Sequence, residues 1–396
     1  ALMEALRWLG LEWDEGPYFQ AQNLDEYNRE AARLLEEKKA YHCYCTPEEL
    51  AAGREEARKQ GKPYRYPGTC RNLSQEEERA FLAEGRTPVI RLITPDEGET
   101  VVEDMIRGRV VFDNSTLDDF IIVKSNGLPT YNFASVVDDA RMQITHVIRA
   151  EEHLSNTPRQ IICAQALGYE LPRYAHVPMI LAPDRSKLSK RHGATSVEEF
   201  RSKGYLPEAL LNYLALLGWS PGEDEILDLS AMIERFSLER VHKTAAIYDV
   251  AKLTWLNGHY LWEADPVRLT QLALPFFQAE GLVAENPGEE DLQYLQKVIE
   301  TVRSRVKTLS ELAEASTYFY RDQFAYDPKG VEKHFKKEGT AELLRKAAET
   351  LEKLPAFDLE STEAAYRDLA ASLGVSSGRL IHPTRLALSG RTMGPG

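Results

Sequence analysis

The sequence has no long apolar run and little cysteine. No stretch of about eighteen apolar residues occurs, which excludes a membrane-spanning helix. The first residues, Ala1 to Gly10, show no basic region followed by an apolar run, so no secretory signal is recognisable. Four cysteines in 396 residues are too few for a disulfide framework. We therefore expect a protein of the reducing cytoplasm that does not associate with a membrane.

Basic residues are also in short supply. The chain has 48 Lys and Arg against 62 Asp and Glu, a net charge of −14, which taken alone argues against a polyanionic partner. Nucleic-acid binding needs only a local basic face, however. Two stretches qualify: residues 184–192, and residues 376–396, where Arg379, Arg385 and Arg391 occur without any acid. Each is interpreted either as ordinary solvated surface or as a polyanion contact.

The length predicts more than one domain. Strand-like runs occupy the first half of the chain, at residues 88–94, 101–112, 119–124, 144–149 and 176–181. The last two runs flank a helix that Thr157 can cap, that Gln160 completes as a capping box and that Gly168 can end, a strand–helix–strand unit of a parallel sheet. After Ser196 only helical periodicity is recognisable, at residues 207–217, 231–236, 266–280, 292–312, 342–354 and 362–373.

The string Lys187-Leu188-Ser189-Lys190-Arg191 follows the last predicted strand after a short loop. Two lysines three residues apart on a loop are strongly hydrated charges with no apolar role. They suit a phosphate substrate whose charge develops during reaction, because a loop can close over it. Taken alone, the string is a weak signal.

The string resembles the second signature of class I aminoacyl-tRNA synthetases, Lys-Met-Ser-Lys-Ser, and lies where that signature lies. Most of the chain is similar, in the same order, to bacterial-type glutamyl-tRNA synthetases. The similar stretches are residues 6–17, 40–45, 118–160, 176–181, 186–200, 204–221, 255–260 and 386–395.

The resemblance implies an α/β fold, in which a Rossmann-like catalytic domain carries an inserted α+β domain for the tRNA acceptor end, followed by an all-α anticodon-binding region. The implied divisions are the first half of the catalytic domain, the inserted domain, the second half of the catalytic domain, the signature loop with a helical stem-contact region, and the anticodon region, at residues 1–40, 41–118, 119–185, 186–265 and 266–396.

The resemblance also implies a glutamate site. Arg149 would hold the side-chain carboxylate of glutamate, since a guanidinium fork suits a planar carboxylate. The alternative is an internal salt bridge from Arg149 to Asp138 or Glu151. Tyr131 would join the same carboxylate, or else be a half-buried core tyrosine. Ser135 stands where the family often has an amide or an apolar residue, which puts its contact with the amino acid in doubt.

The resemblance places ATP beside the glutamate site. Glu152 and His153 would line the ATP pocket with the backbone near Met179 and Ile180, because ligands bind at strand carboxyl ends; the alternative for both is a solvated turn. The signature residues would contact the phosphates and act in catalysis: Lys187, Ser189, Lys190 and Arg191. We expect Mg²⁺ to accompany ATP, whose phosphates supply oxygen ligands.

Cys43-x-Cys45 followed after 24 residues by Cys70 resembles the zinc-binding insertion of part of the family. The fourth ligand is often a histidine two residues after the last cysteine, where this chain has Asn72, a poor zinc ligand. Tyr66 is a candidate replacement. A zinc site and a set of spare thiols both stay open. Cys163 lies in an apolar run and is interpreted as a core residue.

The implied activity is ATP-dependent charging of tRNA(Glu) with L-glutamate through glutamyl-adenylate, by a monomer. The first family signature, His-x-Gly-His, is absent from these residues, as is the first strand with its glutamate-binding arginine. We therefore expect a fragment that does not act alone. Three rivals remain: a glutaminyl-tRNA synthetase, whose anticodon region is built of β-barrels; a truncated paralogue without an anticodon region; and a non-catalytic tRNA- or nucleotide-binding protein.

Overall fold

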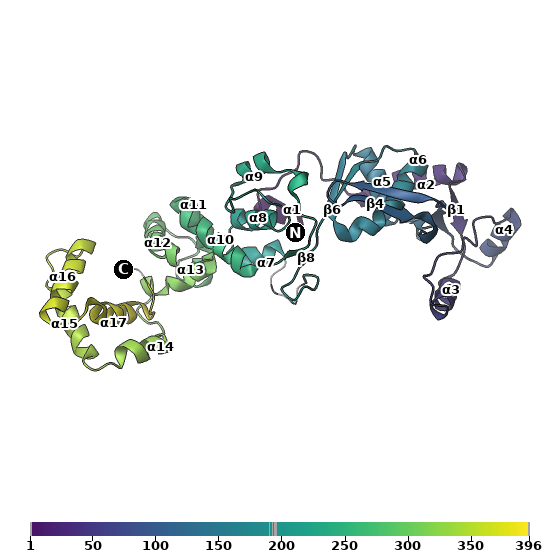
Figure 1. Cartoon of the computed structure of the whole chain (residues 1–396). Coiled ribbons are helices and arrows are strands. Elements are labelled where there is room, and N and C mark those ends of the chain that lie inside the picture. Colours follow the sequence, from purple (N-terminus) through teal and green to yellow (C-terminus); the bar gives the residue numbers. More distant parts are fainter. Residues whose placement is uncertain (1, 190, 192, 194–195, 395–396) are drawn as a thin grey trace. The chain divides into compact units, whose positions relative to one another are not determined.

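The computed structural model of the chain describes residues 2–189, 191, 193 and 196–394. Two compact units can be distinguished. The sheet unit comprises Glu12–Leu188 and Ala215–Tyr248, and the helical unit comprises Ala1–Leu11, Ser189–Leu214 and Asp249–Gly396. Each is described by itself (Figure 1). Among the described residues, no helix has both the length and the apolar character needed to cross a membrane.

The sheet unit contains a mixed sheet of four strands in the order β4-β3-β7-β6. The central strands β3 and β7 are parallel, as are β7 and β6, whereas β3 and β4 form an antiparallel hairpin. The predicted strand–helix–strand unit is therefore present as β6, α6 and β7. These elements are β3 (Glu99–Asp104), β4 (Gly108–Asp113), β6 (His146–Ala150), α6 (Thr157–Leu167) and β7 (Arg173–Val177).

Two smaller sheets accompany it. An antiparallel sheet joins β1 (Ala40–Cys43), β2 (Val89–Leu92) and β5 (Ile121–Val123), and a two-residue ladder joins β8 (Ile180–Leu181) to β9 (Ala246–Ile247). The helices α2 (Leu24–Glu36), α5 (Tyr131–Arg141) and α6 contribute to one apolar core that includes Tyr27, Leu34, Phe133 and Cys163. Cys163 is fully buried, which confirms its interpretation as a core residue.

Three sequence predictions about strands need correction. The run 101–112 is a hairpin rather than one strand, because Gly108 takes a left-handed φ of 78°. The run 176–181 is divided between β7 and β8, because Pro178 has no N–H to continue a ladder. The prediction of no strand after Ser196 was wrong for β9, which is too short to show a period.

The helical unit confirms the predicted helices of the second half, and β9 belongs to the sheet unit. Helices α10 (Val250–Glu263), α11 (Pro266–Ala279), α12 (Glu289–Val302) and α13 (Leu309–Ala315) pack around a core that includes Leu261, Leu269, Phe277 and Ile299. A second, small cluster joins α15 (Thr340–Glu352), α16 (Leu359–Ser372) and α17 (Ser377–Ser389).

The other described helices are short or lie between these groups. They are α1 (Leu2–Trp8), α3 (Pro47–Lys59), α4 (Gln75–Ala83), α7 (Val197–Ser202), α8 (Pro207–Leu216), α9 (Leu229–Arg235) and α14 (Pro328–Gly330). Single turns occur at η1 (Gln20–Gln22), η2 (Asn114–Thr116), η3 (Glu151–Asn156), η5 (Leu238–Arg240), η6 (Arg303–Arg305), η7 (Thr317–Phe319) and η8 (Val331–Phe335).

Candidate functional site

Arg149, on β6, makes hydrogen bonds only to neutral groups. Its Nε donates to His176 Nε2 at 3.1 Å, and its Nη2 donates to Thr157 Oγ1 at 2.9 Å and to Gln160 Oε1 at 2.6 Å. Its Nη1 lies 3.5 Å from the hydroxyl of Tyr131. The register explains the first contact, since Arg149 and His176 are partners in the parallel pair β6–β7. The other two come from the start of α6, which follows β6 through η3.

Neither salt bridge proposed from the sequence as the alternative role of Arg149 is formed. Asp138 accepts hydrogen bonds from the Tyr27 hydroxyl at 2.6 and 2.8 Å, and Glu151 pairs with Arg107. In the part of the chain that the structure describes, no carboxylate lies within ion-pair distance of Arg149. Burial raises the pKa of the nearby Asp139 to about 6, although the charge of Arg149 opposes this effect, and Asp139 forms no ion pair with it. The half-buried guanidinium has neutral hydrogen-bond partners, so an incoming carboxylate can pair with its charge.

Thr157 and Gln160 do not act as the predicted helix caps. The helix begins at Thr157 itself, and neither Asn156 nor any other side chain caps it. The Thr157 hydroxyl instead donates to the carbonyl of His153 at 3.2 Å and accepts a hydrogen bond from Arg149 Nη2. The Gln160 amide nitrogen donates to Ser135 Oγ at 3.0 Å. Ser135 therefore lies in the same hydrogen-bonded network as Arg149, one bond further out.

Tyr131 is the first residue of α5, and 52% of it is exposed. The alternative of a half-buried core tyrosine does not apply. Its ring centroid lies 5.7 Å from that of His153, in a tilted contact. The tyrosine thus joins the predicted glutamate site at Arg149 to the predicted ATP site at His153, and leaves its face open to a ligand.

Sequence reasoning missed a buried pair behind Arg149. Asp104 Oδ2 lies 2.6 Å from His176 Nδ1, and both side chains are inaccessible to solvent. Burial lowers the pKa of His176, although Asp104 opposes this effect. Burial would raise the pKa of Asp104, but its hydrogen bonds from backbone amides and from His176 lower it overall. Polar residues at matching places in two buried strands were the available signal for His176. Asp104 had none, because the hairpin that carries it was not recognised.

The candidate ATP residues gather where β6 and β7 end. Lys187 forms an ion pair with Glu152, which lowers the pKa of that carboxyl, although both side chains are well exposed. The backbone N–H of Met179 donates to Glu151 at 3.1 Å, and the carbonyl of Ile180 accepts from the N–H of Leu188 at 3.4 Å. The structure therefore brings Lys187 to Glu152 and next to the β8 backbone.

The rest of the signature string is less completely defined. Ser189 and Arg191 are described, and each has interactions of its own. Lys190 lies outside the described residues. The tight turn before the string is closed by a hydrogen bond from Ala182 N–H to the Ser186 carbonyl at 2.8 Å, and Arg185 takes a φ of 62° there.

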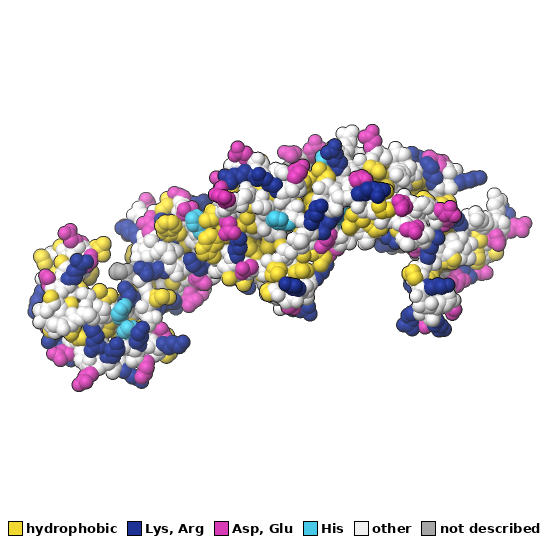
Figure 2. All heavy atoms as spheres, in the orientation of Figure 1, with side chains coloured by type: hydrophobic (Ala, Val, Ile, Leu, Met, Phe, Trp, Pro, Cys, Tyr) yellow, Lys and Arg dark blue, Asp and Glu magenta, His cyan; other side chains and the backbone are white. Residues whose placement is uncertain are grey.

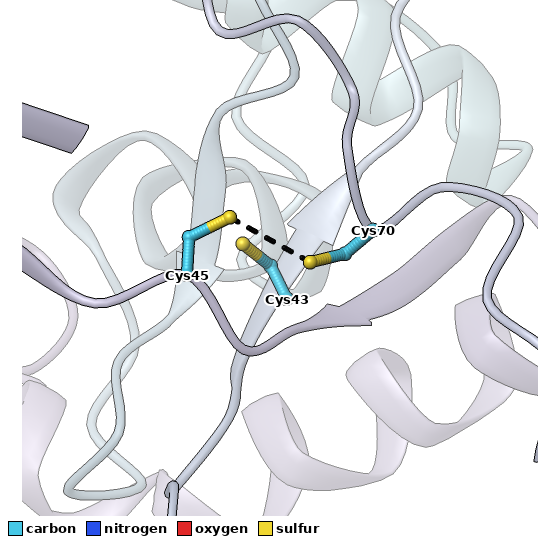
Figure 3. Close-up of side chains that lie close together, drawn as sticks. All are labelled: Cys43, Cys45 and Cys70. Atoms are coloured by element: carbon cyan, nitrogen blue, oxygen red, sulfur yellow. Dashed lines mark hydrogen bonds between the residues drawn. The ribbon is translucent and has the colours of Figure 1, made fainter. Parts of the chain in front are cut away.

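Three of the four cysteines form a cluster at the end of β1 (Figure 3). The sulfurs of Cys43, Cys45 and Cys70 all lie within 4.8 Å of one another, and those of Cys45 and Cys70 are 3.6 Å apart. The Tyr66 hydroxyl lies 3.3 Å from the Cys43 sulfur and 3.6 Å from that of Cys45. Hydrogen bonding with Cys70 lowers the pKa of Cys43 to about 4, despite burial. All four predicted metal-site residues are thus brought together.

Arg91 covers the cluster from the side of Tyr66. Its guanidinium carbon lies 3.9 Å from the centre of the Tyr66 ring, and its Nη1 donates to the Asp119 carbonyl at 2.6 Å. Only 5% of the residue is exposed, and its Nε is buried without a hydrogen-bond partner in the described part of the chain. This places a positive charge beside Cys43, the thiol of the cluster whose pKa is lowered.

A basic cavity lies in the helical unit, between η8 and α17. It has a volume of about 480 Å³, and its lining includes Lys333, His334, Lys337, Arg379 and His382. Figure 2 shows basic and histidine side chains gathered over this part of the unit. Of the three arginines in the predicted basic stretch, Arg379 lines the cavity, whereas Arg391 pairs with Glu314.

Comparison with known families matches both halves of the chain. Residues 1–255 match the family described as tRNA synthetases class I (E and Q), catalytic domain, and residues 268–396 match an anticodon binding domain. The class of protein that the fold and the site define is therefore a class I tRNA synthetase. This excludes the truncated rival that lacks an anticodon region.

Individual relatives narrow the family. The glutamate–tRNA ligase of Moorella thermoacetica is 61% identical over 404 residues, covering 100% of this chain and 82% of the relative. Glutamate–tRNA ligase 1 of Caldanaerobacter subterraneus is 58% identical with the same coverage. A crystal structure of a glutamate tRNA ligase from Elizabethkingia meningosepticum in complex with its amino acid matches with a TM-score of 0.84 and 33% identity, over 100% of this chain and 84% of that one. The chain belongs to the glutamate–tRNA ligases, which confirms the predicted family, fold class and enzyme class.

Proposed function

We propose that Arg149 is the residue by which this chain recognises the side-chain carboxylate of glutamate, for ATP-dependent charging of tRNA(Glu). The observation that carries the proposal is the neutrality of every partner of Arg149, with the exposed Tyr131 beside its Nη1. In the reaction, the α-carboxylate of glutamate attacks the α-phosphorus of ATP and pyrophosphate leaves. The terminal adenosine hydroxyl of the tRNA then attacks the adenylate carbonyl, and AMP leaves.

The hydrogen-bonding pattern supports selection against glutamine. A guanidinium has donors only, so it has no acceptor for the amide N–H groups of glutamine. The resemblance suggested a bidentate contact between the guanidinium fork and the carboxylate. Because Nε and Nη2 are already engaged, the available donors are those of Nη1. The carboxylate is expected to bind at Nη1, with the Tyr131 hydroxyl as its second partner and Ser135 behind Gln160.

The ATP site is proposed at the neighbouring strand ends, with Glu152, His153, the backbone of Met179 and Ile180, and the signature lysines. Lys187 pairs with Glu152 without ligand and is 66% exposed, so it can exchange this carboxylate for a phosphate. Lys190, Ser189 and Arg191 are proposed to act with it on the developing phosphate charge. Mg²⁺ would accompany ATP and neutralise its phosphates.

A structural zinc ion is proposed at Cys43, Cys45, Cys70 and Tyr66. Three thiols and one phenol oxygen converge, which matches the four ligands of a closed tetrahedral site. Three thiolates around Zn²⁺ leave a net negative charge in a buried place. The guanidinium of Arg91, stacked on Tyr66, supplies a compensating charge. Arg91 also interacts with Cys43, and this interaction favours the thiolate form that a zinc ligand requires.

The remaining proposals concern the partner and the assembly. We propose that the basic cavity of the helical unit receives a phosphate of tRNA(Glu), because it combines two lysines and one arginine. A glutaminyl-tRNA synthetase with a β-barrel anticodon region is disfavoured by the helices of residues 266–389. The monomeric state and the cytoplasmic location stay predictions, and light scattering of the purified chain tests the first.

Replacement of Arg149 tests the proposed function, in the chain completed to the full length of its relatives. Arg149→Gln removes the charged partner of a desolvated carboxylate and should cost about 2–5 kcal/mol in kcat/KM for glutamate. Arg159→Gln is the matched control, since Arg159 lies in the first turn of α6 and contacts the Ser155 carbonyl and Asp118. Unchanged glutamate kinetics in Arg149→Gln would show that the carboxylate binds elsewhere.

A further inference from the structure

The buried pair Asp104–His176 has a defined pattern of donors and acceptors. Asp104 Oδ1 accepts from the backbone N–H groups of Ile106 at 3.0 Å and Arg107 at 2.8 Å, and both Asp104 oxygens accept from His176 N–H at 3.1 and 3.2 Å. Its Oδ2 lies 2.6 Å from His176 Nδ1. A carboxylate fixed by this many donors is ionised, so His176 Nδ1 carries the proton between them.

The other ring nitrogen of His176 is then an acceptor. A neutral imidazole with its proton on Nδ1 has a lone pair on Nε2. Arg149 Nε always carries a hydrogen and lies 3.1 Å from this nitrogen. The opposite tautomer would leave the Nδ1 lone pair 2.6 Å from an oxygen of the Asp104 carboxylate, and it would turn the N–H groups of Nε2 and of Arg149 Nε toward each other. Thr157 Oγ1 also lies 3.2 Å from His176 Nε2, but the contacts to Asp104 and to Arg149 are satisfied together only when the proton is on Nδ1.

We propose that Asp104 and His176 are positioning residues, in which Asp104 fixes the His176 tautomer whose Nε2 orients Arg149 so that Nη1 meets the substrate carboxylate. Three acceptors, at His176, Thr157 and Gln160, engage Nε and Nη2 and leave Nη1 for the ligand. The claim that Nη1 meets the substrate carboxylate rests on the proposed role of Arg149. The claim about the His176 tautomer is independent of that role.

The sequence origin of Asp104 gives this inference wider meaning. Asp104 ends β3, in a hairpin that belongs to the predicted inserted domain, residues 41–118. β3 pairs with β7 at Asp104 and Tyr174, and the next amide, Met105 N–H, donates to the Tyr174 carbonyl at 2.8 Å. The inserted segment therefore supplies the carboxylate that stands two hydrogen bonds behind the proposed glutamate site.

The first experiment reads the tautomer directly in residues 1–396. Nitrogen-15 NMR of the protein labelled at its nine histidines distinguishes a protonated ring nitrogen from one with a lone pair, and the His176→Asn spectrum assigns the signal. We expect Nδ1–H in the unmodified protein. In Asp104→Asn, the side-chain oxygen stays on the backbone amides and the new NH₂ faces Nδ1, so the proton should move to Nε2. Nε2–H in the unmodified protein would overturn the proposal, whatever the variants do.

The second experiment separates orientation from simple packing, in the chain completed to the length of its relatives. His176→Gln can keep an acceptor at the Nε2 position, and His176→Asn can keep the donor to Asp104 while losing that acceptor. We expect His176→Asn to raise KM for glutamate by about 10- to 100-fold, with His176→Gln much closer to the unmodified enzyme and ATP affinity unchanged in both. Equal glutamate KM in two equally stable variants would reject the positioning role.

The two experiments fail independently of the proposed function. If Arg149→Gln leaves glutamate kinetics intact while the NMR shows Nδ1–H, the role of Arg149 is wrong but the Asp104–His176 pair is correct. If Arg149→Gln is impaired and the NMR shows Nε2–H, the glutamate site stands and the positioning pair is rejected.

Discussion

Two arginines of this protein, Arg149 and Arg91, are expected to have different roles because the groups around them differ. Both residues lie on β-strands, Arg149 on β6 and Arg91 on β2, and each contacts a tyrosine. Arg149 has neutral hydrogen-bond partners and a side open to ligand. Arg91 is enclosed and faces thiols. The surroundings of Arg149 suit a substrate carboxylate that binds and leaves, and those of Arg91 suit thiolates that belong to the protein.

Arg91 should therefore contribute to zinc affinity. We expect one zinc per chain, loss of the metal in Cys43→Ser, and affinity about 10- to 100-fold lower in Arg91→Met, which keeps the bulk of the side chain but removes its charge. Competition with a chelator measures this affinity. Arg58→Met is the control, since Arg58 lies on α3 in the same segment and forms an exposed ion pair with Glu55. Absence of metal from a stably folded protein would contradict the zinc proposal.

Asp139 predicts a pH dependence of stability. Burial raises the pKa of Asp139 to about 6 from 3.8, so the folded state binds this proton more tightly than the unfolded state. The contribution is favourable below about pH 4 and is lost as the pH rises to about 6. Asp139→Asn should thus be stabilised relative to the unmodified chain at pH 7.5 more than at pH 4. Urea unfolding at both values measures the difference.

A control with the opposite sign is available in Asp113. Hydrogen bonds from Ser115 lower the pKa of Asp113, so its contribution is present at neutral pH and is lost as the pH falls. Asp113→Ala should be destabilised at pH 7.5 and less so at pH 4. The same pH trend in both variants would reject the interpretation of Asp139.

At the scale of elements, the sequence predicted the positions of strands and helices well. It predicted the roles of the residues that begin them less well. The α6 segment was predicted from Thr157, Gln160 and Gly168, and Gly168 does end it in a left-handed conformation with φ of 72°. Thr157 and Gln160 fit a cap by type, but they bind Arg149 instead. A capping pattern cannot distinguish these roles, because the competing partner, Arg149, lies on β6, outside the residues that make up the pattern.

Other elements were missed for local reasons. The prediction of a single helix over 292–312 was wrong, because α12 ends at Val302 and Thr308 caps a new helix, α13. The helix α17 was not predicted, and its Gly378 and Pro383 are residues that weaken a helical signal. The motifs singled out Arg149, Tyr131 and Ser135, which the structure brings into one hydrogen-bonded network and whose roles stay predictions, whereas Asp104 and His176 required the sheet register. The roles of the signature residues stay predictions.

The signature loop should act in chemistry more than in ground-state binding. Lys187→Ala and Lys190→Ala should each slow adenylate formation by about 10²- to 10³-fold, the effect of removing one transition-state donor, while ATP binding weakens far less. Rapid-quench measurement of adenylate at saturating tRNA tests this. Lys124→Ala, an exposed lysine after β5, is the control. A normal adenylation rate with weakened tRNA binding would assign the lysines to the tRNA backbone instead.

At the scale of the whole molecule, the charge distribution differs from the net charge. The chain carries −14 overall, yet the cavity between η8 and α17 is lined by two lysines, one arginine and two histidines. Such a site can attract a polyanion despite the acidic average, because screening confines electrostatic interactions to about 10 Å at ordinary salt. Composition alone could not have located it, since Lys333 and Lys337 lie far from Arg379 in the sequence.

Lys337 should report tRNA binding through its salt dependence. If Lys337 contacts one phosphate, Lys337→Ala should reduce the slope of log affinity against log salt by about one, for cognate and non-cognate tRNA alike. Filter binding over a range of salt concentrations measures the slope. Lys346→Ala is the control, because Lys346 pairs with Glu342 on α15 and does not line the cavity. An identical reduction in both variants would indicate only a general charge effect.

The pairing of β3 with β7 has a consequence for protein engineering. The inserted segment looks detachable in the sequence, with natural cut points near residues 41 and 118. A chimera that exchanged the whole segment between relatives would also exchange Asp104, the residue that holds His176. A chimera that keeps residues 99–113 of the recipient takes β3, β4 and their partner β7 from the same parent. Recombination designed by contacts rather than by sequence blocks would therefore place its crossovers before β3 and after β4.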